Sequence, residues 1–416
     1  MNRLNAIPLI NSGYIVNPKK IIFFTIFLLT FLFSGIITML HIIPYRMGLT
    51  SALIIPLIFI YGLKVNRVLI AYLLLVIFIG LSALFNYSSI VELIIFLRIL
   101  VFSYLIYYLV EIFIDQDNIS KIIKLCIIIA VIQLPIIIFQ QAFYDLVPDR
   151  LIQGIYYIDF DFGTFNANDA PLSIFLILIV IFLLFDKKHN YIIRYKWPIS
   201  LWLTLTVFVV NSELSKIIIM IVWVIYLIRY LNIKVLISSL VLFSLIFGIL
   251  AMTGVLDQIW TDLSRSFSAN ITAGQLQEEA FLSGSYGRGA AVAYYLNQSV
   301  KWFGDGPSKY YNVFSNIRMR GNTGHIFTFY SEVGLFGWLL SVSIFFLFAF
   351  PVRDSKIRIS WVSILSFVSL MILSFTTQIM NDISIVLIYL IVIKSYLVPQ
   401  QVEPMNIRIN QKGFNT

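Results

Sequence analysis

The chain has 416 residues, of which 60% are hydrophobic and 12% are charged. No soluble fold of this length could bury so much apolar surface, so the composition excludes a soluble enzyme or binding domain and indicates that lipid is the solvent. The formal net charge of +9 does not indicate a nucleic-acid partner, because the basic residues punctuate hydrophobic runs as membrane anchors do. The one cysteine, Cys126, excludes disulfide bonds and cysteine-rich metal sites.

Apolar runs long enough to cross a bilayer follow one another along most of the chain. The first run follows a polar segment, residues 1–20. It is too long for the core of a signal peptide and has no small-residue cleavage site, so we expect an uncleaved helix. We predict an all-α polytopic membrane protein with about twelve transmembrane helices, nine within residues 21–252 and three within 325–398, before a tail at 399–416. The expected helices lie near 21–41, 47–63, 66–84, 90–114, 120–141, 169–185, 198–211, 215–231, 233–252, 325–350, 359–379 and 383–398.

The basic residues also predict the orientation of these helices. If the N-terminus is cytoplasmic, most of the lysines and arginines fall in inside segments, and the short outside loops are almost free of them. We therefore expect both termini, residues 1–20 and 399–416, in the cytoplasm.

Two outside segments are too long to be simple turns, namely residues 142–168 and 253–324. The second carries many aromatic residues, and its stretch 288–300 is predicted to be a helix with an apolar face, ended by glycine and proline. We expect a large helical extracytoplasmic loop that covers the outer surface as a lid. Asp159 and Asp161, in the first segment, form a D-x-D pattern; the same spacing occurs in a cytoplasmic loop, so we predict no metal site.

Ionisable residues inside membrane-spanning runs are costly and are functional candidates by default. Glu92 and Arg98 share the fourth predicted helix. Glu92 suits an ion pair with a neighbouring helix, and Arg98 could reach a phosphate or carboxylate inside the bundle. Lys216, in N-S-E-L-S-K, begins the eighth helix at its outer mouth. It either snorkels with Glu213 as its partner or holds an anion at the positive end of the helix dipole.

His325 opens the tenth predicted helix directly after the large loop, and Glu332 follows seven residues later on the same face. A histidine at a water-filled mouth can serve as a general base. Seven residues span about 10.5 Å of helix, so both side chains cannot easily touch one atom. We therefore predict two catalytic residues with separate roles, one acting on substrate and the other holding a cation deeper in the bundle. Arg265 and Arg288 lie in the large loop, where guanidinium groups suit phosphate oxygens.

Four segments together resemble the O-antigen polymerase and O-antigen ligase superfamily of bacterial envelope proteins. G-T-F-N-A-N-D-A-P, residues 163–171, is similar to a segment that precedes a helix in the family, and N-S-E-L-S-K is similar to its S-x-S-R helix start. S-G-S-Y-G-R-G with W-F-G-D-G-P-S-K-Y, and then H-I-F-T-F-Y-S-E-V-G-L-F-G, resemble its remaining two patterns. Lys216 replaces the usual arginine, and Ile326 replaces the usual asparagine.

The resemblance implies a membrane glycosyltransferase of the GT-C-like type that works without metal or cofactor on undecaprenyl-diphosphate-linked glycans. Its site would lie on the extracytoplasmic side of the bacterial inner membrane. Lys216 and Arg288 would bind diphosphate, His325 would serve the acceptor hydroxyl, and Asn168 and Arg265 would also contact substrate. Chain-length regulators and flippases would be partner proteins.

Three functions remain open from the sequence. A polymerase and a ligase differ only in the acceptor, either another lipid-linked repeat unit or the lipid A core, and we prefer polymerase by resemblance. A flippase or other transporter would be expected to have paired broken helices, internal repeats and charges near the membrane midplane. Most candidate groups instead lie at the outer mouth and in one asymmetric loop, which favours an enzyme.

Overall fold

The computed structural model describes most of the predicted membrane domain and little of the large loop. The described residues are 18–40, 43–63, 65–147, 160–165, 169–186, 195–210, 212–230, 244, 248, 299–309, 311–312, 317–318, 324–353, 356–357 and 359–397. Most of three predicted regions therefore lies outside the description. These are the ninth span apart from residues 244 and 248, the helix predicted at 288–300 apart from its last two residues, and the terminal segments apart from residues 18–20.

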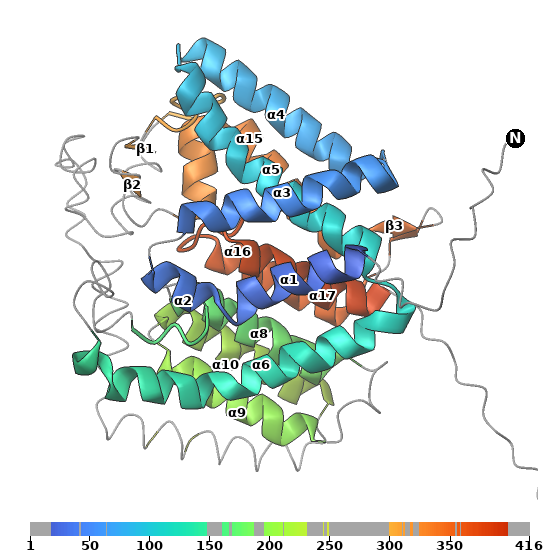
Figure 1. Cartoon of the computed structure of the whole chain (residues 1–416), viewed down its shortest axis with the longest axis vertical. Coiled ribbons are helices and arrows are strands. Elements are labelled where there is room, and N and C mark those ends of the chain that lie inside the picture. Colours follow the sequence, from blue (N-terminus) through green and yellow to red (C-terminus); the bar gives the residue numbers. More distant parts are fainter. Residues whose placement is uncertain are drawn as a thin grey trace, which may run out of the picture.

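The described residues form a bundle of helices (Figure 1). Its helices are α1 (Pro18–Phe31), α2 (Ser34–Met39), α3 (Ile43–Tyr61), α4 (Arg67–Phe85), α5 (Ile90–Phe113), α6 (Gln116–Ala142), the 3-10 turn η1 (Tyr144–Leu146), α8 (Asp169–Phe185), α9 (Lys196–Val209), α10 (Glu213–Tyr230), α15 (His325–Ala349), α16 (Trp361–Leu373) and α17 (Ile383–Leu397).

Two short antiparallel pairs of strands accompany the helices. β1 (Tyr311–Asn312) pairs with β2 (Ile317–Arg318) in the large loop, and β3 (Val352–Arg353) pairs with β4 (Lys356–Ile357) between α15 and α16. Each strand has two residues, so the pairs act as turns and the architecture is helical.

Four of the described helices, α4, α5, α6 and α15, are long and apolar enough to cross a membrane. Several others are shorter apolar helices, including α8, α9, α16 and α17. The all-helical membrane character predicted from composition is thus confirmed at this level. The first predicted span, however, is divided into α1 and α2, and the tenth is bent.

Local sequence explains where the long helices begin. The side chain of Asn66 accepts the amide of Leu69 at the start of α4, at 2.8 Å. Ser89 and Glu92 form a reciprocal capping box at the start of α5. Glu92 is therefore a helix-capping residue of α5, where we had expected an ion pair with another helix.

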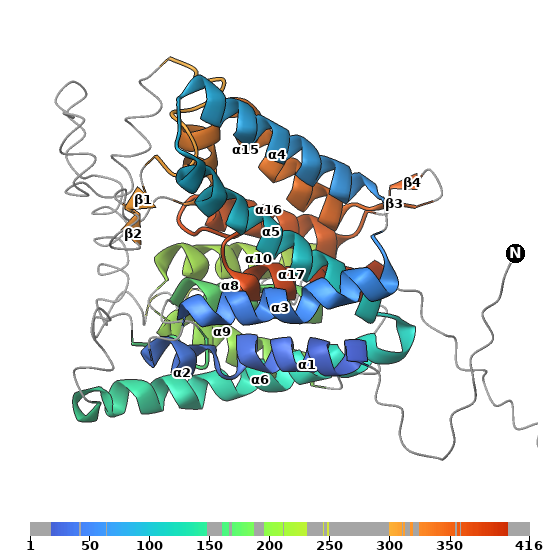
Figure 2. The same cartoon turned by 45° about the horizontal axis from the view of Figure 1, so that its top comes forward.

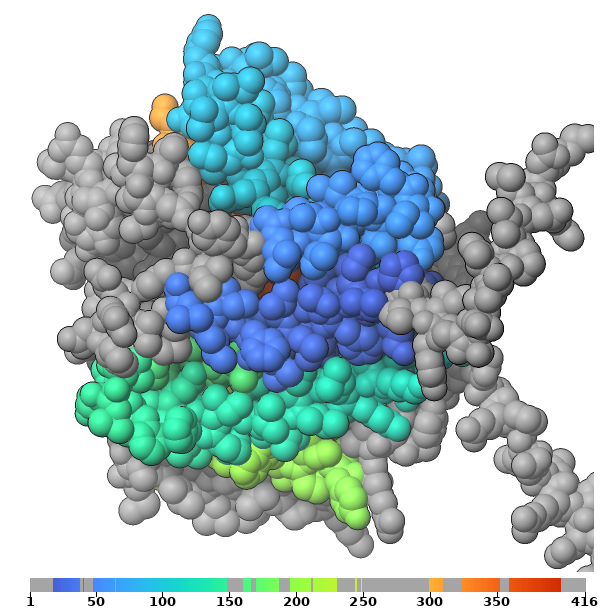
Figure 3. Space-filling view, in the orientation of Figure 1, coloured from blue at the N-terminus to red at the C-terminus, as the bar shows by residue number. Residues whose placement is uncertain are grey.

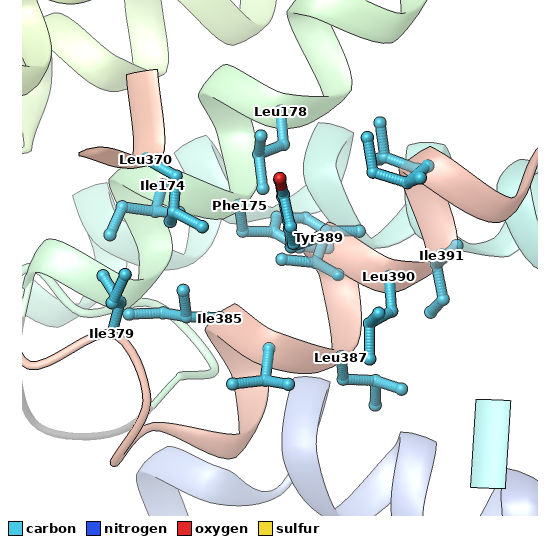
Figure 4. Close-up of a cluster of buried hydrophobic side chains, with 14 of the residues drawn as sticks. Ile174, Phe175, Leu178, Leu370, Ile379, Ile385, Leu387, Tyr389, Leu390 and Ile391 are labelled. Carbon is cyan, nitrogen blue, oxygen red and sulfur yellow. The ribbon is translucent and has the colours of Figure 1, made fainter. Parts of the chain in front are cut away.

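The core lies around α17, of which every residue from Ile383 to Val392 is buried. Helices α5, α6, α8 and α16 pack around it. Figure 4 shows Tyr389 of α17 among the side chains of Phe175 and Leu178, and its hydroxyl donates to the carbonyl of Phe345 at 3.1 Å.

Figure 2 shows α1, α3 and α6 running alongside one another across the bundle. In the space-filling view α4, α3, α1 and α6 form successive bands over one face (Figure 3).

Candidate functional site

The helix that begins at His325 is sharply bent. Gly334 has φ 83° and ψ −172°, which no α-helix contains and which only glycine adopts readily. The His325 ring lies 4.4 Å from the Phe329 ring and 5.9 Å from the Phe345 ring, centroid to centroid. Twenty residues of straight helix would separate His325 from Phe345 by about 30 Å. α15 is therefore a helical hairpin, and we call the bend at Gly334 the α15 corner.

The first arm of α15 is anchored at His325 by the α16–α17 connection, residues 374–382. The amide of His325 donates to the carbonyl of Thr377 at 3.0 Å, and the amide of Ile326 donates to Ser374 at 3.3 Å. These bonds satisfy helix-start amides that have no partner within the helix. Gly324 lies so close to the connection that a Cβ there would be 2.2 Å from the Phe375 backbone. His325 itself is buried.

His325 lies where the first arm of α15 meets the connection that leads into α17. The connection accepts its amide and ends at Ile383, where the buried helix α17 begins. The sequence placed His325 at the start of its helix, and the structure has it at that position.

Lys216 lies on a second helix that packs against α16. The Arg229 guanidinium lies 4.2 Å from the centre of the Trp361 ring, so the end of α10 lies beside the start of α16. Lys216 is about 20 Å along α10 from Arg229, and the end of α16 at Leu373 is about 18 Å from Trp361. Both α10 and α15 contact α16. Lys216 and the connection that binds His325 therefore lie toward the same end of α16.

Lys216 is almost fully buried and its ammonium lies 2.6 Å from a carboxylate oxygen of Glu213. This is the partner that the sequence suggested. The other oxygen of Glu213 is buried and makes no hydrogen bond among the described residues. Hydroxyls of Ser212, Ser215 and Ser173 form a chain beside the pair, with oxygen separations of 2.8 and 2.9 Å. The lysine thus stands in a polar environment at the start of α10.

Glu332, the second predicted catalytic residue, faces a segment from the large loop. Residues 299–309, the docked segment, insert at the α15 corner, where the bend releases backbone groups of the helix. The Glu332 carboxylate accepts the amide of Ser308 at 2.8 Å, and Glu332 is buried. In the structure this side chain holds the docked segment in place. The seven-residue separation from His325 keeps it about 10.5 Å along the arm.

Backbone hydrogen bonds complete the docking. The amides of Asp305 and Gly306 donate to the carbonyls of Ser331 and Glu332, at 2.8 and 3.1 Å, and the amide of Leu335 donates to Lys301 at 2.8 Å. These bonds replace helical ones that the bend at Gly334 removes. The docked segment and the corner therefore form one hydrogen-bonded unit.

Helix α4 packs against the unit formed by the docked segment and the α15 corner, and two glycines of the segment allow close approach. The Ser82 hydroxyl lies 2.5 Å from the Phe303 carbonyl and 2.8 Å from the Glu332 carbonyl, and the Asn86 amide donates to Gly304 at 3.2 Å. Gly304 has φ +69°, and a Cβ there would lie 2.5 Å from the Glu332 backbone. Gly306 has φ +106°, and a Cβ there would lie 2.4 Å from the Ser88 hydroxyl oxygen, so both glycines of the G-D-G sequence lie where a side chain would not fit.

The G-T-F motif docks in a similar way between α1 and α2. The amide of Gly35 donates to the carbonyl of Thr164 at 3.0 Å, and the Thr164 hydroxyl donates to Phe31 at 2.5 Å. Gln133 and Gln140 of α6 bond the backbone of the same segment. This motif therefore closes the break in the first predicted span.

The other predicted site residues are not gathered with His325. Arg98 is exposed on the same face of α5 as Val91, Ile94 and Val101, so it does not point into the bundle as we had expected. The residues outside the description are Arg265, Arg288 and Asn168.

Nothing among the described residues forms a metal centre. Asp161 is buried beside the G-T-F motif, and its D-x-D partner Asp159 is outside the description. No cluster of three or more histidine, cysteine, aspartate or glutamate side chains occurs in the part of the chain that the structure describes.

Sequence reasoning missed the α16–α17 connection, which binds the start of the first arm of α15. The signal was the polar run T-T-Q-I-M-N-D between two apolar runs, at 376–382. We had placed half of it inside a span and half in a turn.

No protein-family model, curated protein or solved structure matches this chain.

Proposed function

We propose that this protein is an O-antigen, or surface polysaccharide, polymerase. It joins undecaprenyl-diphosphate-linked repeat units by inverting glycosyl transfer at the outer face of the bacterial inner membrane. The observation that carries the proposal is that a buried lysine, Lys216, and a buried histidine, His325, lie on two helices that both contact α16. Such a pair would supply the cation and the base that the transfer requires.

The roles follow from the chemistry of the transfer. His325 takes the proton of the acceptor hydroxyl, the oxygen attacks the anomeric carbon, and the bond from that carbon to the diphosphate oxygen breaks. Lys216 stabilises the negative charge that develops on the leaving diphosphate. Glu213 holds the lysine before the donor arrives, and the diphosphate takes over part of that ion pair. Arg288 and Arg265 of the large loop would add further cations, and Asn168 would contact the glycan.

Glu332 acts as a positioning residue in this proposal. Its carboxylate binds the Ser308 amide and fixes the docked segment, which in turn holds the α15 corner from which the His325 arm descends. Arg98, exposed on α5, would meet the lipid diphosphate on its way from the bilayer and not inside the bundle.

The proposal includes the finer architecture. About twelve transmembrane helices in a GT-C-like arrangement would carry the site on the extracytoplasmic side, with both termini in the cytoplasm. A flippase would deliver the lipid-linked units, and a chain-length regulator would determine how many are joined.

The test uses purified protein, lipid-linked repeat units and EDTA, with products resolved by size. His325→Phe keeps an aromatic ring against Phe329 and Phe345 and keeps the backbone bond to Thr377, so it should fold and should lose about a hundredfold or more of its activity. Lys216→Met should also lose activity, whereas Lys216→Arg, which retains the cation, should keep most of it. A full ladder of products from His325→Phe would refute the assigned base, and transfer only to lipid A core would indicate a ligase.

One observation favours a transporter as the second candidate. Helices α1 and α2 are interrupted, and α15 is bent, which resembles the broken helices of transporters. Both interruptions, however, are closed by hydrogen bonds from residues 160–165 and 299–309. Movement of lipid-linked glycan across vesicles without a ladder of products would establish transport.

A further inference from the structure

We propose that Asn381 and Asp382, in the α16–α17 connection, form a carbohydrate-binding subsite that holds the acceptor sugar beside His325. The inference rests on the proposed glycosyl transfer and names a part of the site that the motifs do not include. The subsite would hold the acceptor sugar, which supplies the attacking hydroxyl, whereas Lys216 would bind the diphosphate of the donor.

The first observation is the exposure of these side chains at the end of a buried helix. α17 is buried from Ile383 to Val392. The residues just before it, among them Gln378, Asn381 and Asp382, are partly exposed. Polar side chains are therefore accessible directly at the end of a helix that is otherwise enclosed by its neighbours.

The second observation is the hydrogen bonding of the two side chains. The backbone amide of Asn381 donates to Gln378 at 3.2 Å, but the side-chain amide makes no hydrogen bond among the described residues. The side-chain oxygen is buried, so the exposed polar edge is the NH₂ group. One oxygen of Asp382 accepts the amide and the hydroxyl of Ser384, at 2.8 and 2.5 Å, which fixes the carboxylate. No hydrogen bond to its other oxygen occurs in the described part of the chain. A side-chain donor and an oriented carboxylate acceptor thus lie on neighbouring residues.

The third observation is the link to His325. Thr377 of the same connection accepts the His325 amide, and the Gln378 amide donates to the Thr328 hydroxyl of the His325 arm at 3.3 Å. The connection and the arm are therefore one hydrogen-bonded assembly. A sugar held by Asn381 and Asp382 would present its ring next to the arm that carries the proposed base.

The chemistry of the subsite selects the ligand class. Residues 374–382 contain no lysine or arginine, and the Asp382 carboxylate would repel a phosphate. Sugar hydroxyls both donate and accept hydrogen bonds, so they match an amide donor beside a carboxylate acceptor. The subsite therefore binds a neutral glycan and discriminates among glycans by the positions of their hydroxyls.

The experiment compares two lipids bound to the purified full-length protein, measured by native mass spectrometry. One is undecaprenyl diphosphate, and the other is the same lipid carrying the host's repeat unit, extracted from cells that lack this chain. Asn381→Ala should weaken binding of the glycan-bearing lipid about tenfold and leave the bare lipid unchanged. Asp382→Asn, which still caps α17, should act in the same way. Ser374→Ala is the matched control, because that buried hydroxyl donates to Met371 at 2.6 Å and faces no ligand.

The outcomes separate the subsite from the function. Loss of both lipids in Asn381→Ala, or loss of neither, would overturn the subsite, and a ladder of products from the native chain would still uphold the polymerase. If the native chain binds neither lipid, the polymerase and the subsite are both overturned. Selective loss in both variants, with normal binding in the control, supports the subsite.

Discussion

The α15 corner and the α16–α17 connection use similar residues in opposite ways. At the corner, the Glu332 carboxylate and the Asn86 amide both bond the docked segment. At the connection, the side-chain amide of Asn381 and one oxygen of Asp382 bond none of the described residues. The difference shows that an acid and an amide at the end of a helix do not by themselves indicate a binding site. The side chain that already has its hydrogen-bond partners holds the fold, and the one that lacks them is available to a ligand.

The strongest test of the corner is Gly334→Ala. Its φ of +83° strains any other residue, and the new Cβ would lie 2.2 Å from the Trp302 carbonyl oxygen. We expect a loss of about 3 kcal/mol or more in the free energy of unfolding, measured by tryptophan fluorescence during heating in detergent.

Gly80→Ala is the matched control for that substitution. Gly80 lies within α4, and its added Cβ would meet nothing within 4 Å. We expect a gain of up to about 1 kcal/mol from higher helix propensity. Equal behaviour of the two variants would show that the corner is not tightly packed.

The next effect in size concerns Glu332. Replacement by alanine removes a charge-assisted hydrogen bond to a buried amide, and we expect it to cost about 1.5–3 kcal/mol of stability. Glu332→Gln keeps an acceptor oxygen and should cost less than about 1 kcal/mol. If Glu332 is catalytic, as the sequence first suggested, the glutamine variant will be stable but inactive in the polymer assay. If it only positions the segment, that variant will retain activity.

A smaller effect is expected for Ser82→Ala. The buried hydroxyl donates toward two backbone carbonyls of the docked unit, and its loss should cost about 1 kcal/mol. Limited proteolysis should show faster cleavage near residues 299–309. Unchanged cleavage would mean that α4 does not hold the segment.

The smallest effect on stability is expected at the connection. Asn381→Ala should change the free energy of unfolding by less than about 0.5 kcal/mol, because the side chain has no described hydrogen-bond partner to lose. Thermal unfolding beside the Glu332→Ala variant provides the comparison. A loss as large as that of Glu332→Ala would place Asn381 with the corner, among the residues that hold the fold.

The sequence by itself indicated that lipid surrounds the protein, and it located most of the helices. The 60% hydrophobic content indicated lipid, and the apolar runs located α3 to α6, α8 to α10 and α17 within a few residues. The run for α16 was placed correctly at its start but extended six residues too far, into the α16–α17 connection. It also singled out Lys216 and His325, and it named Glu213 as the partner of Lys216, because an ionisable residue in an apolar run is conspicuous.

Only the tertiary structure decided which elements these residues contact and which of them have hydrogen-bond partners. An apolar run in the sequence indicates a segment that avoids water. The run looks the same whether the helix crosses the membrane straight or folds back on itself. The bend at Gly334 requires partners for the released backbone groups, and these come from residues 299–309, which are distant in the chain. The sequence also did not show which way a side chain faces, so Arg98, which we had expected inside the bundle, is exposed. Asn381 and Asp382 were interpreted from the sequence as part of an ordinary turn.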